Sequence, residues 1–418
     1  MSAVLEGGSL PGADDGRNPA GETILVLNCG SSSIKFALFG AGVDPLPRAP
    51  LWSGQVEGIG GSNPRLLAKD AAPVALALNR ERPYHDALQS VRACVEARTG
   101  GRLPAAVAHR VVHGGSKYTR PVRVDRAVLE DLRSCIPLAP LHQPFALQAI
   151  GILLAEVPGL SQVACFDTAF HSTLPQVEQM LPLPRAFWKR GIRRYGFHGL
   201  SYEYMAIALP QRHGQAAAGR TIVGHLGSGA SLCAMQGLRS VATTMGFSAL
   251  EGLMMGTRSG SLDPGVLLHL LQTEKMSVDQ IAHLLYRESG LLGVSGSSAS
   301  AKQLLAVETS DPCARAALEL YVRRIVREIG ALAAVLGGLD MLAFTAGVGE
   351  HSAVLRERIC GALGWLGVEL DPNANASHAA TISSARSRVR VAVEPTNEEW
   401  VAASQAVALL RAGRAVCS

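Results

Sequence analysis

The chain has 418 residues, of which 48% are hydrophobic and 17% are charged, and its formal net charge is +5 at pH 7. Such a length favours two domains, and the hydrophobic content is ample for the core of a large globular enzyme. Aromatic residues make up only 5% and are not interleaved with a basic run, which disfavours nucleic acid as a partner and suits small anionic substrates better.

The cysteines and the N-terminal segment indicate where such a protein works. Eight cysteines lie at irregular spacings without a CxxC pair, which is typical of reduced thiols and not of a disulfide framework or a zinc site. No apolar run approaches the length of a membrane span. Residues 1–21 lack the charged start and apolar centre of a signal peptide and read as a disordered tail. We therefore predict a cytoplasmic protein with no membrane partner.

The first ordered segment, Ile24 to Phe39, reads ILVLNCGSSSIKFALF. Two short β-runs joined by a small polar turn predict a hairpin. Glycine and successive N–H groups in such a turn can approach an anion, and Lys35 adds a point charge. The segment alone is equally consistent with a phosphate-binding turn and with an ordinary hairpin whose serines face water. It lacks the spacing of a Walker loop and the helix that follows one.

The next elements alternate between helix and strand. We predict a loop-rich region up to about residue 84, a helix near 85–98, a strand over 105–112, a helix near 144–156 and a short buried strand over 163–166.

The strand over 105–112 carries chemical side chains. His109 and His113 are four residues apart, but they lie on a predicted strand with no glutamate between them, so a metal site is disfavoured. The fork of Arg110 can clamp a carboxylate or a phosphate, although a lone arginine more often forms a surface ion pair. Asp167 ends the following strand, where ligand sites of α/β sheets lie, and a helix or turn cap is the competing interpretation.

The second half of the chain echoes the first. Thr221 to Ala234, TIVGHLGSGASLCA, repeats the plan of strand, glycine and serine turn, and strand. Phe344 to Glu350 is predicted to be a glycine loop between a strand and a helix, where it can expose N–H groups. The polar loop Met245 to Gly265 contains Arg258 and leads into a helix, which favours a functional role.

Two helices complete the chain. Pro312 and the pair Gly337-Gly338 bound a long helix from Asp311 to about Leu336. The segment PTNEE introduces a last helix that Thr396 or Asn397 is placed to cap. The repeated hairpins therefore predict a duplicated α/β fold.

The motifs LNCGSSSIKF, HRVVHGG, LAPLH, FDTAFH, YGFHG, HLGSG, MGFSALEG, GTRSG, FTAGVGE and PTNEE occur in the order found in acetate kinase and its short-chain carboxylate kinase relatives. The chain resembles this family from about Thr23 to the last helix. The resemblance implies the duplicated, ribonuclease-H-like α/β fold of actin, sugar kinases and the heat-shock-70 ATPase, with two domains and a central cleft. It places residues 22–167 and 400–418 in an N-terminal domain and 168–399 in a C-terminal domain with most nucleotide contacts.

The resemblance also implies an activity, which is reversible phosphoryl transfer from ATP to a small carboxylate, with Mg²⁺ or Mn²⁺ and usually as a homodimer. By motif, Asn28 and Glu398 would hold the metal, and Lys35 would contact nucleotide phosphates. Arg110 would hold the substrate carboxylate and Asp167 would be the catalytic acidic residue. The residues expected to stabilise charge in the transition state are His198 and Arg258.

Further expected contacts follow from the same motifs. The apolar lining of the carboxylate pocket would comprise Val112, Leu141, Phe197 and Ala249. The phosphate and nucleotide contacts would comprise Ser31, Ser33, His225, Leu226, Gly227, Ser228, Gly229, Ser300, Ala301, Lys302, Gly347, Val348, Gly349, Glu350 and His351.

Several positions depart from the family pattern. Ser228 and His351 stand where asparagine is usual, and Lys302 stands where an arginine is typical near adenosine. An Arg-to-Lys change loses the planar fork that can stack on a base. Ala249 replaces a proline, and the smaller side chain can admit an extra methylene. Three alternatives therefore accompany the acetate kinase prediction: a propionate-preferring kinase, a kinase that uses pyrophosphate, and a non-catalytic nucleotide-binding relative.

Overall fold

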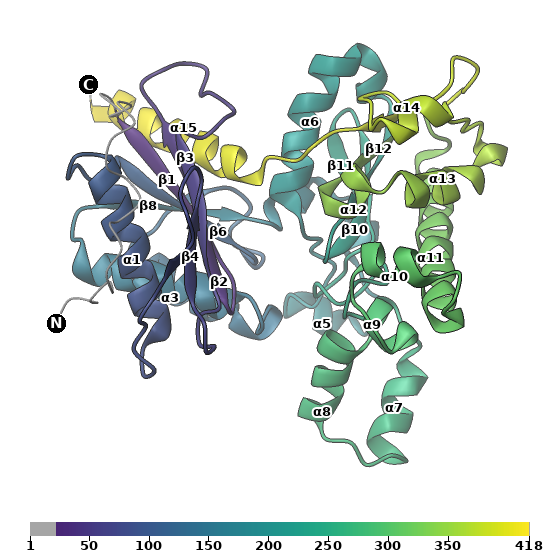
Figure 1. The fold of residues 1–418 in the computed structure, drawn as a ribbon, viewed down its shortest axis with the longest axis horizontal. Coiled ribbons are helices and arrows are strands. Elements are labelled where there is room, and N and C mark those ends of the chain that lie inside the picture. The colour runs from purple at the N-terminus through teal and green to yellow at the C-terminus, as the bar shows by residue number, and fades with distance from the viewer. Residues whose placement is uncertain (1–21, 418) are drawn as a thin grey trace. The chain divides into compact units, whose positions relative to one another are not determined.

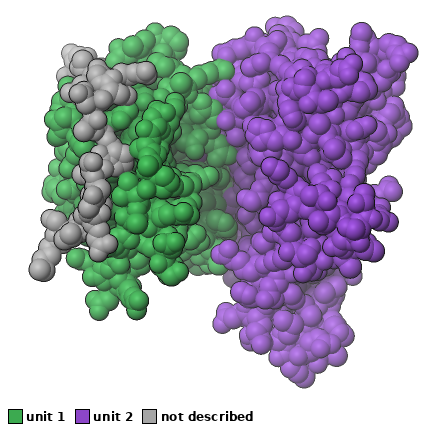
Figure 2. Space-filling view, viewed as in Figure 1, with its two compact units in different colours: residues 1–169, 397–418 green, residues 170–396 purple. Residues whose placement is uncertain are grey.

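The computed structural model describes residues 22–417, so the predicted tail 1–21 lies outside the described residues. The chain divides into two compact units: unit 1 contains residues up to 169 and from 397 onwards, and unit 2 contains residues 170–396 (Figure 2). Residues 168–169 and 397–399 therefore belong with unit 1 and not with the C-terminal domain in which the sequence placed them. Within residues 22–417, no helix is long and apolar enough to cross a membrane.

Unit 1 contains an eight-stranded sheet in the order β5-β4-β3-β2-β1-β6-β8-β7. The predicted hairpin is confirmed, because β1 and β2 pair antiparallel, while β1, β6 and β8 run parallel. The loop-rich prediction up to residue 84 is wrong in part, since three strands extend the hairpin there. Polar residues and a glycine interrupt the apolar pattern of β3, and β4 and β5 have only four and two residues. The strands are β1 Thr23–Cys29, β2 Ser33–Gly40, β3 Trp52–Glu57, β4 Arg65–Ala68, β5 Val74–Ala75, β6 Ala106–Val111, β7 Val122–Arg123 and β8 Ser161–Phe166.

Helices cover both faces of this sheet (Figure 1). Helices α1 (Pro83–Arg98) and α3 (Gln143–Glu156) confirm two predicted helices and bury Leu88 and Ile150 in one core with β1 and β2. Helix α15 (Glu398–Cys417) packs on the other face through its alanine-rich first turns. Asn397 caps it, as predicted, because its Oδ1 accepts from the N–H of Trp400 at 3.0 Å. Helix α2 (Arg126–Arg133) lies against α3.

Unit 2 repeats the central part of this topology. Its sheet has the order β11-β10-β9-β12-β13, with an antiparallel β9–β10 hairpin and parallel β9, β12 and β13. The order β3-β2-β1-β6-β8 in unit 1 has the same pairing directions. The duplication predicted from the echo of the first hairpin is thus confirmed. The strands are β9 Arg220–Leu226, β10 Ala230–Gln236, β11 Arg239–Thr243, β12 Met341–Thr345 and β13 Arg390–Val393.

Helix α11 (Pro312–Leu336) confirms the long helix of the sequence, with Asp311 as N-cap and Gly337 in the left-handed conformation after it. The predicted glycine loop before a helix is wrong in one respect, because residues 346–351 are themselves a short helix, α12. The remaining helices are α4 Gln176–Gln179, α5 Arg185–Lys189, α6 Gly199–His213, α7 Pro264–Gln272, α8 Val278–His283, α9 Gly290–Ser295, α10 Ala301–Val307, α12 Ala346–His351, α13 Ala353–Gly361 and α14 Pro372–Ala376.

A buried histidine makes the stability of unit 1 sensitive to acid. His109 on β6 is fully buried and its Nε2 lies 2.8 Å from Gln162 Oε1. Burial lowers the pKa of His109 to about 4, although the bond to Gln162 opposes the shift. At His109 the unfolded chain therefore binds one more proton than the folded chain between about pH 6.5 and pH 4, so the contribution of this residue to stability falls as the pH falls through this window.

We expect His109→Gln to flatten that pH dependence by about one proton. The measurement is the free energy of unfolding in denaturant between pH 4.5 and pH 7. His283→Gln serves as the matched control for the loss of a histidine, since the His283 side chain is 63% exposed. An unaltered slope in His109→Gln would exclude this histidine as the source of acid sensitivity.

Candidate active site

The carboxyl ends of three adjacent parallel strands gather polar side chains in unit 1. Asn28 lies near the end of β1, Arg110 near the end of β6, and Asp167 directly follows β8. The strand register places the three residues at nearly the same position along the strands, because Leu27 pairs with His109 and Arg110 pairs with Cys165. This edge is where ligands bind in open α/β sheets.

Arg110 is held by two carboxylates. Its Nε lies 3.0 Å from Asp167 Oδ1 and its Nη2 lies 2.7 Å from Asp167 Oδ2, so the pair is bidentate. Its Nη1 lies 2.9 Å from Oε2 of Glu398, the first residue of α15. The Asp167 side chain is 3% exposed and that of Glu398 is 13% exposed. The structure therefore brings together three of the predicted site residues within unit 1.

The charges in this cluster oppose one another. Burial disfavours the charged guanidinium, but Asp167 and Glu398 outweigh it and raise the pKa of Arg110 above its ordinary value. Burial, and after it the neighbouring Glu399, raises the pKa of Glu398, while Arg110 and Lys35 partly offset the shift. The ionised form of Glu398 therefore depends on nearby positive charge.

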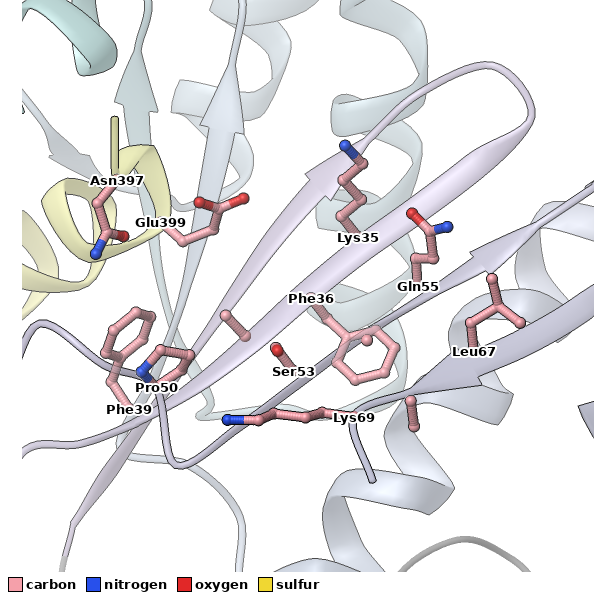
Figure 3. Close-up of a pocket in the computed structure, with 13 residues that line it drawn as sticks. Lys35, Phe36, Phe39, Pro50, Ser53, Gln55, Leu67, Lys69, Asn397 and Glu399 are labelled. Carbon is pink, nitrogen blue, oxygen red and sulfur yellow. The ribbon is translucent and has the colours of Figure 1, made fainter. Parts of the chain in front are cut away.

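Lys35, on β2, borders a pocket of about 540 Å³ in unit 1. Lys35 and Glu399 lie at one end of this pocket and Lys69 lies at the other (Figure 3). Ser31 in the hairpin turn is exposed and Ser33 is half-buried. The exposed turn and lysine are consistent with the predicted phosphate contacts.

A second group of candidate residues lies in unit 2. His198 precedes α6 in the left-handed conformation, with φ of 59°. Its Nδ1 lies 2.8 Å from Ser231 Oγ, and its ring stacks on His225 with centroids 4.1 Å apart. Nδ1 of His225 lies 2.9 Å from Ser201 Oγ. Both histidines are thus fixed in orientation.

Arg258 lies in the long polar loop, and its Nη1 donates to the carbonyl oxygen of Ala249 at 2.7 Å. Burial lowers the pKa of Arg258. A Cβ added at Gly229 would lie 3.1 Å from Arg258 Nη2 and 3.3 Å from His198 Nε2. Arg258 and His198 therefore border the same small space beside the HLGSG turn.

We predict that turnover is sensitive to substitution of Gly229, because an added Cβ would enter this space. We expect Gly229→Ala to displace Arg258 and His198 and to lower turnover about tenfold or more, because small displacements of positioned groups are costly. The measurement is steady-state turnover together with the melting temperature. The matched control is Gly361→Ala, because Gly361 has a helical backbone and no atom within 4 Å of an added Cβ. Gly237 is unsuitable as a control, because its φ of 58° would strain an alanine. Gly361→Ala should retain full turnover, and equal turnover of Gly229→Ala would contradict the prediction.

The predicted nucleotide segments gather in unit 2. A Cβ at Gly227 would lie 3.6 Å from Ala346 Cβ, and a Cβ at Gly256 would lie 3.0 Å from the carbonyl oxygen of Ala299. The N–H of Gly256 donates to the carbonyl oxygen of Ser228 at 3.3 Å. The turn of HLGSG, the start of α12 and the residues before α10 are therefore neighbours.

Individual members of these segments differ in exposure. Ser228, Lys302, Gly347 and His351 are exposed, Val348 and Ser300 are half-buried, and Leu226, Ala301 and Gly349 are buried. Ser300 caps α10 by accepting from the N–H of Gln303 at 3.4 Å.

Glu350 has a structural task that the sequence did not reveal. Its Oε1 accepts from the N–H of Ala346 at 2.7 Å and from the N–H of Thr396 at 3.3 Å. The buried Arg356 donates to the carbonyl oxygens of Gly349 and Glu350, each at 2.8 Å. Together they hold α12 in place.

The expected lining of the carboxylate pocket is divided between the two units. Val112 and Leu141, both half-buried, belong to unit 1 with Arg110. Phe197, which is 2% exposed, and the half-buried Ala249 belong to unit 2.

Sequence reasoning missed several residues of these clusters. Ser231, Tyr202 and Ser201 fix the two histidines, and Glu399 contributes charge beside Glu398. Glu399 belongs to the PTNEE motif. Ser231 belongs to the repeated hairpin, where alternation on β10 places its side chain on the same face as that of Cys233. No local signal distinguishes Tyr202.

Known proteins resemble the sequence over most of its length. The sequence model of the Acetokinase family matches residues 23–404. An acetate kinase from Rhodopseudomonas palustris (strain TIE-1) is 49% identical over 399 residues, which cover 94% of this chain and 100% of that protein.

Solved structures agree as well. A propionate kinase from Francisella tularensis is 34% identical with a TM-score of 0.85, covering 92% of this chain and 98% of that one. An acetate kinase from Porphyromonas gingivalis is 35% identical with a TM-score of 0.83, covering 93% of this chain and 100% of that one. The predicted α/β fold class is confirmed.

Proposed function

Because the chain belongs to the acetokinase family, we propose that it transfers a phosphoryl group reversibly between ATP and acetate, giving acetyl phosphate and ADP. The observation that carries this proposal is the bidentate pairing of Arg110 with a carboxylate at the carboxyl ends of β6 and β8. Arg110 has a further donor, Nη1, which is paired with Glu398 in the structure. The carboxylate of a short acid can replace that of Glu398 beside Nη1 of Arg110.

Within unit 1, Arg110 would bind the acetate carboxylate while Asp167 keeps its guanidinium oriented. Asp167 is less suited to general base catalysis, because a carboxylate substrate is already ionised at neutral pH. Val112 and Leu141, which are half-buried in the same unit, would supply apolar contacts to the methyl group. Lys35 would contact phosphate oxygens of the nucleotide, since its exposed ammonium lies on the same β-hairpin as Asn28.

The donor set fits Mg²⁺ or Mn²⁺ as the metal. Asn28 and Glu398 offer an amide and a carboxylate oxygen, the hard ligands that these ions prefer, and they leave positions for phosphate oxygens and water. The raised pKa of Glu398 supports this assignment, because a buried carboxylate gains from an added positive charge. When bound, the ion would neutralise charge on the phosphates.

Within unit 2, His198 and Arg258 would donate hydrogen bonds to the phosphoryl oxygens as negative charge spreads over them. Two anions react, so cationic and hydrogen-bonding groups that offset their repulsion are the main requirement for catalysis. The turns of residues 225–229 and 347–351 would hold ATP, which is consistent with their proximity within the unit.

An acyl phosphate assay tests the proposal. Purified protein is incubated with acetate, propionate or butyrate and with ATP, GTP or pyrophosphate, and the acyl phosphate is trapped with hydroxylamine. We expect the highest yield with acetate and ATP. Product only with pyrophosphate would show that pyrophosphate, and not ATP, is the phosphoryl donor. No product from any pair would favour the non-catalytic alternative.

A preference for propionate is the second candidate, and Ala249 is the residue that favours it. Ala249 stands where the family usually has proline, and its carbonyl oxygen holds Arg258. We expect Ala249→Pro to raise the ratio of kcat/KM for acetate over propionate about tenfold, since one methylene is worth about 1–3 kcal/mol. Competition assays with both acids measure the ratio, and equal ratios in the two proteins would count against this role of Ala249.

We also propose that the protein is a cytoplasmic homodimer. In support, helix α7 has no buried residue although it is apolar, and Leu268 and Val278 of α7 and α8 are 55% and 73% exposed. The cysteines from Cys29 to Cys360 are free thiols. The molar mass of the protein in solution, determined by light scattering, tests the dimer.

A further inference from the structure

A chain of hydrogen bonds leads from the interior of unit 2 to His198. Oη of Tyr202, on α6, lies 2.5 Å from Oγ of Ser231, on β10, and that oxygen lies 2.8 Å from Nδ1 of His198. Tyr202 and Ser231 are both fully buried. Water therefore does not compete for these groups, and the direction of each bond is set by the protein.

The direction follows from the available hydrogens. Burial raises the pKa of Tyr202 well above its ordinary value, so its hydroxyl keeps its proton. The backbone of His225 also bonds to this hydroxyl and stabilises its charged form, as an N–H donor does. The Tyr202 hydrogen is then directed to Ser231, and the single hydrogen of Ser231 is directed to Nδ1 of His198.

We propose that Ser231 and Tyr202 are positioning residues that hold His198 in the neutral tautomer with its hydrogen on Nε2. A nitrogen that accepts a hydrogen bond carries no hydrogen, so Nε2 becomes the donor of the ring. Nε2 borders Gly229 on the side where Nη2 of Arg258 lies. The inference rests on the proposed role of His198 as a donor to phosphoryl oxygens.

The stacking of His225 on the His198 ring also supports the neutral form of His198. His225 stacks on His198 with an angle of 14° between the rings, and Ser201 and Thr396 continue its hydrogen bonds, with their hydroxyl oxygens 2.9 Å apart. Two imidazolium rings stacked 4.1 Å apart beside Arg258 would repel each other strongly. One neutral donor avoids that cost.

Nitrogen NMR of protein labelled with ¹⁵N-histidine tests the tautomer directly, with His198→Gln used to assign the signal. We expect a protonated Nε2 and an unprotonated Nδ1 in His198. In Ser231→Ala and Tyr202→Phe we expect a mixture of tautomers and a loss of about tenfold in kcat with unchanged KM, as for one hydrogen bond to a reacting group. Ser231→Thr, which keeps the hydroxyl, should retain most of kcat.

A double-mutant cycle separates positioning from a general structural effect. In a His198→Ala background, Ser231→Ala should cause no further loss of kcat. An equal loss in both backgrounds, or a protonated Nδ1 in the wild-type protein, would overturn the inference. Normal turnover of His198→Ala alone would reject the proposed function of His198, while the NMR measurement would still report on the hydrogen-bond chain.

Discussion

Replacing Arg258 by alanine is expected to lower kcat about 10²–10³-fold, because a lost donor to transition-state charge typically costs about 3–4 kcal/mol. The structure supports this assignment in two ways. The guanidinium is held by the carbonyl oxygen of Ala249 at 2.7 Å, and it borders the same space as His198. Within residues 22–417 its guanidinium donates to a carbonyl group and pairs with no carboxylate, so the substitution leaves no carboxylate without its partner. Folding should therefore change little.

The matched control is Arg287→Ala, since Arg287 is an exposed arginine close enough to influence the pKa of Arg258. It should retain nearly all activity. Turnover is measured at saturating acetate and ATP, and the melting temperature shows whether each variant is folded. A folded Arg258→Ala protein with near-normal kcat would remove Arg258 from the catalytic group.

Arg110→Ala is expected to affect stability as well as activity. The substitution leaves Asp167, whose side chain is 3% exposed, without its bidentate partner. Removing one partner of a buried pair commonly destabilises by about 3–5 kcal/mol, so the midpoint of unfolding should fall clearly. The KM for acetate should rise at the same time, because the carboxylate loses its proposed ligand.

A double variant separates the two effects. Arg110→Ala with Asp167→Asn removes one of the two carboxylate charges that lose Arg110, so it should recover part of the lost stability without recovering acetate binding. Denaturant unfolding and acetate titration measure the two quantities. An unfolding midpoint of Arg110→Ala equal to that of the wild-type protein would show that the pair contributes nothing to folding.

The elements with strong local signals could be predicted from the residues alone. The apolar β-runs in Ile24 to Phe39 and their echo from Thr221 predicted both hairpins, and Pro312 with Gly337 predicted the bounds of α11. The motif order predicted the family, and that prediction is confirmed. These features succeed because they depend on short segments whose pattern is visible without their partners. Strands β3 to β5 were not predicted, because they are recognisable only by their pairing with one another.

The contacts of the side chains in the site could not be predicted from the residues alone, because they form when distant segments fold together. Arg110 and Glu398 lie far apart in the chain but form an ion pair of 2.9 Å, and Asp167 completes it. Ser231 on β10 lies 2.8 Å from His198, which precedes α6, and Glu350 accepts a hydrogen bond from the N–H of Thr396. Such contacts join residues from different elements, so neither periodicity nor local spacing contains them. Hydrogen-bond direction and burial, which set charge and tautomer, arise from that packing alone.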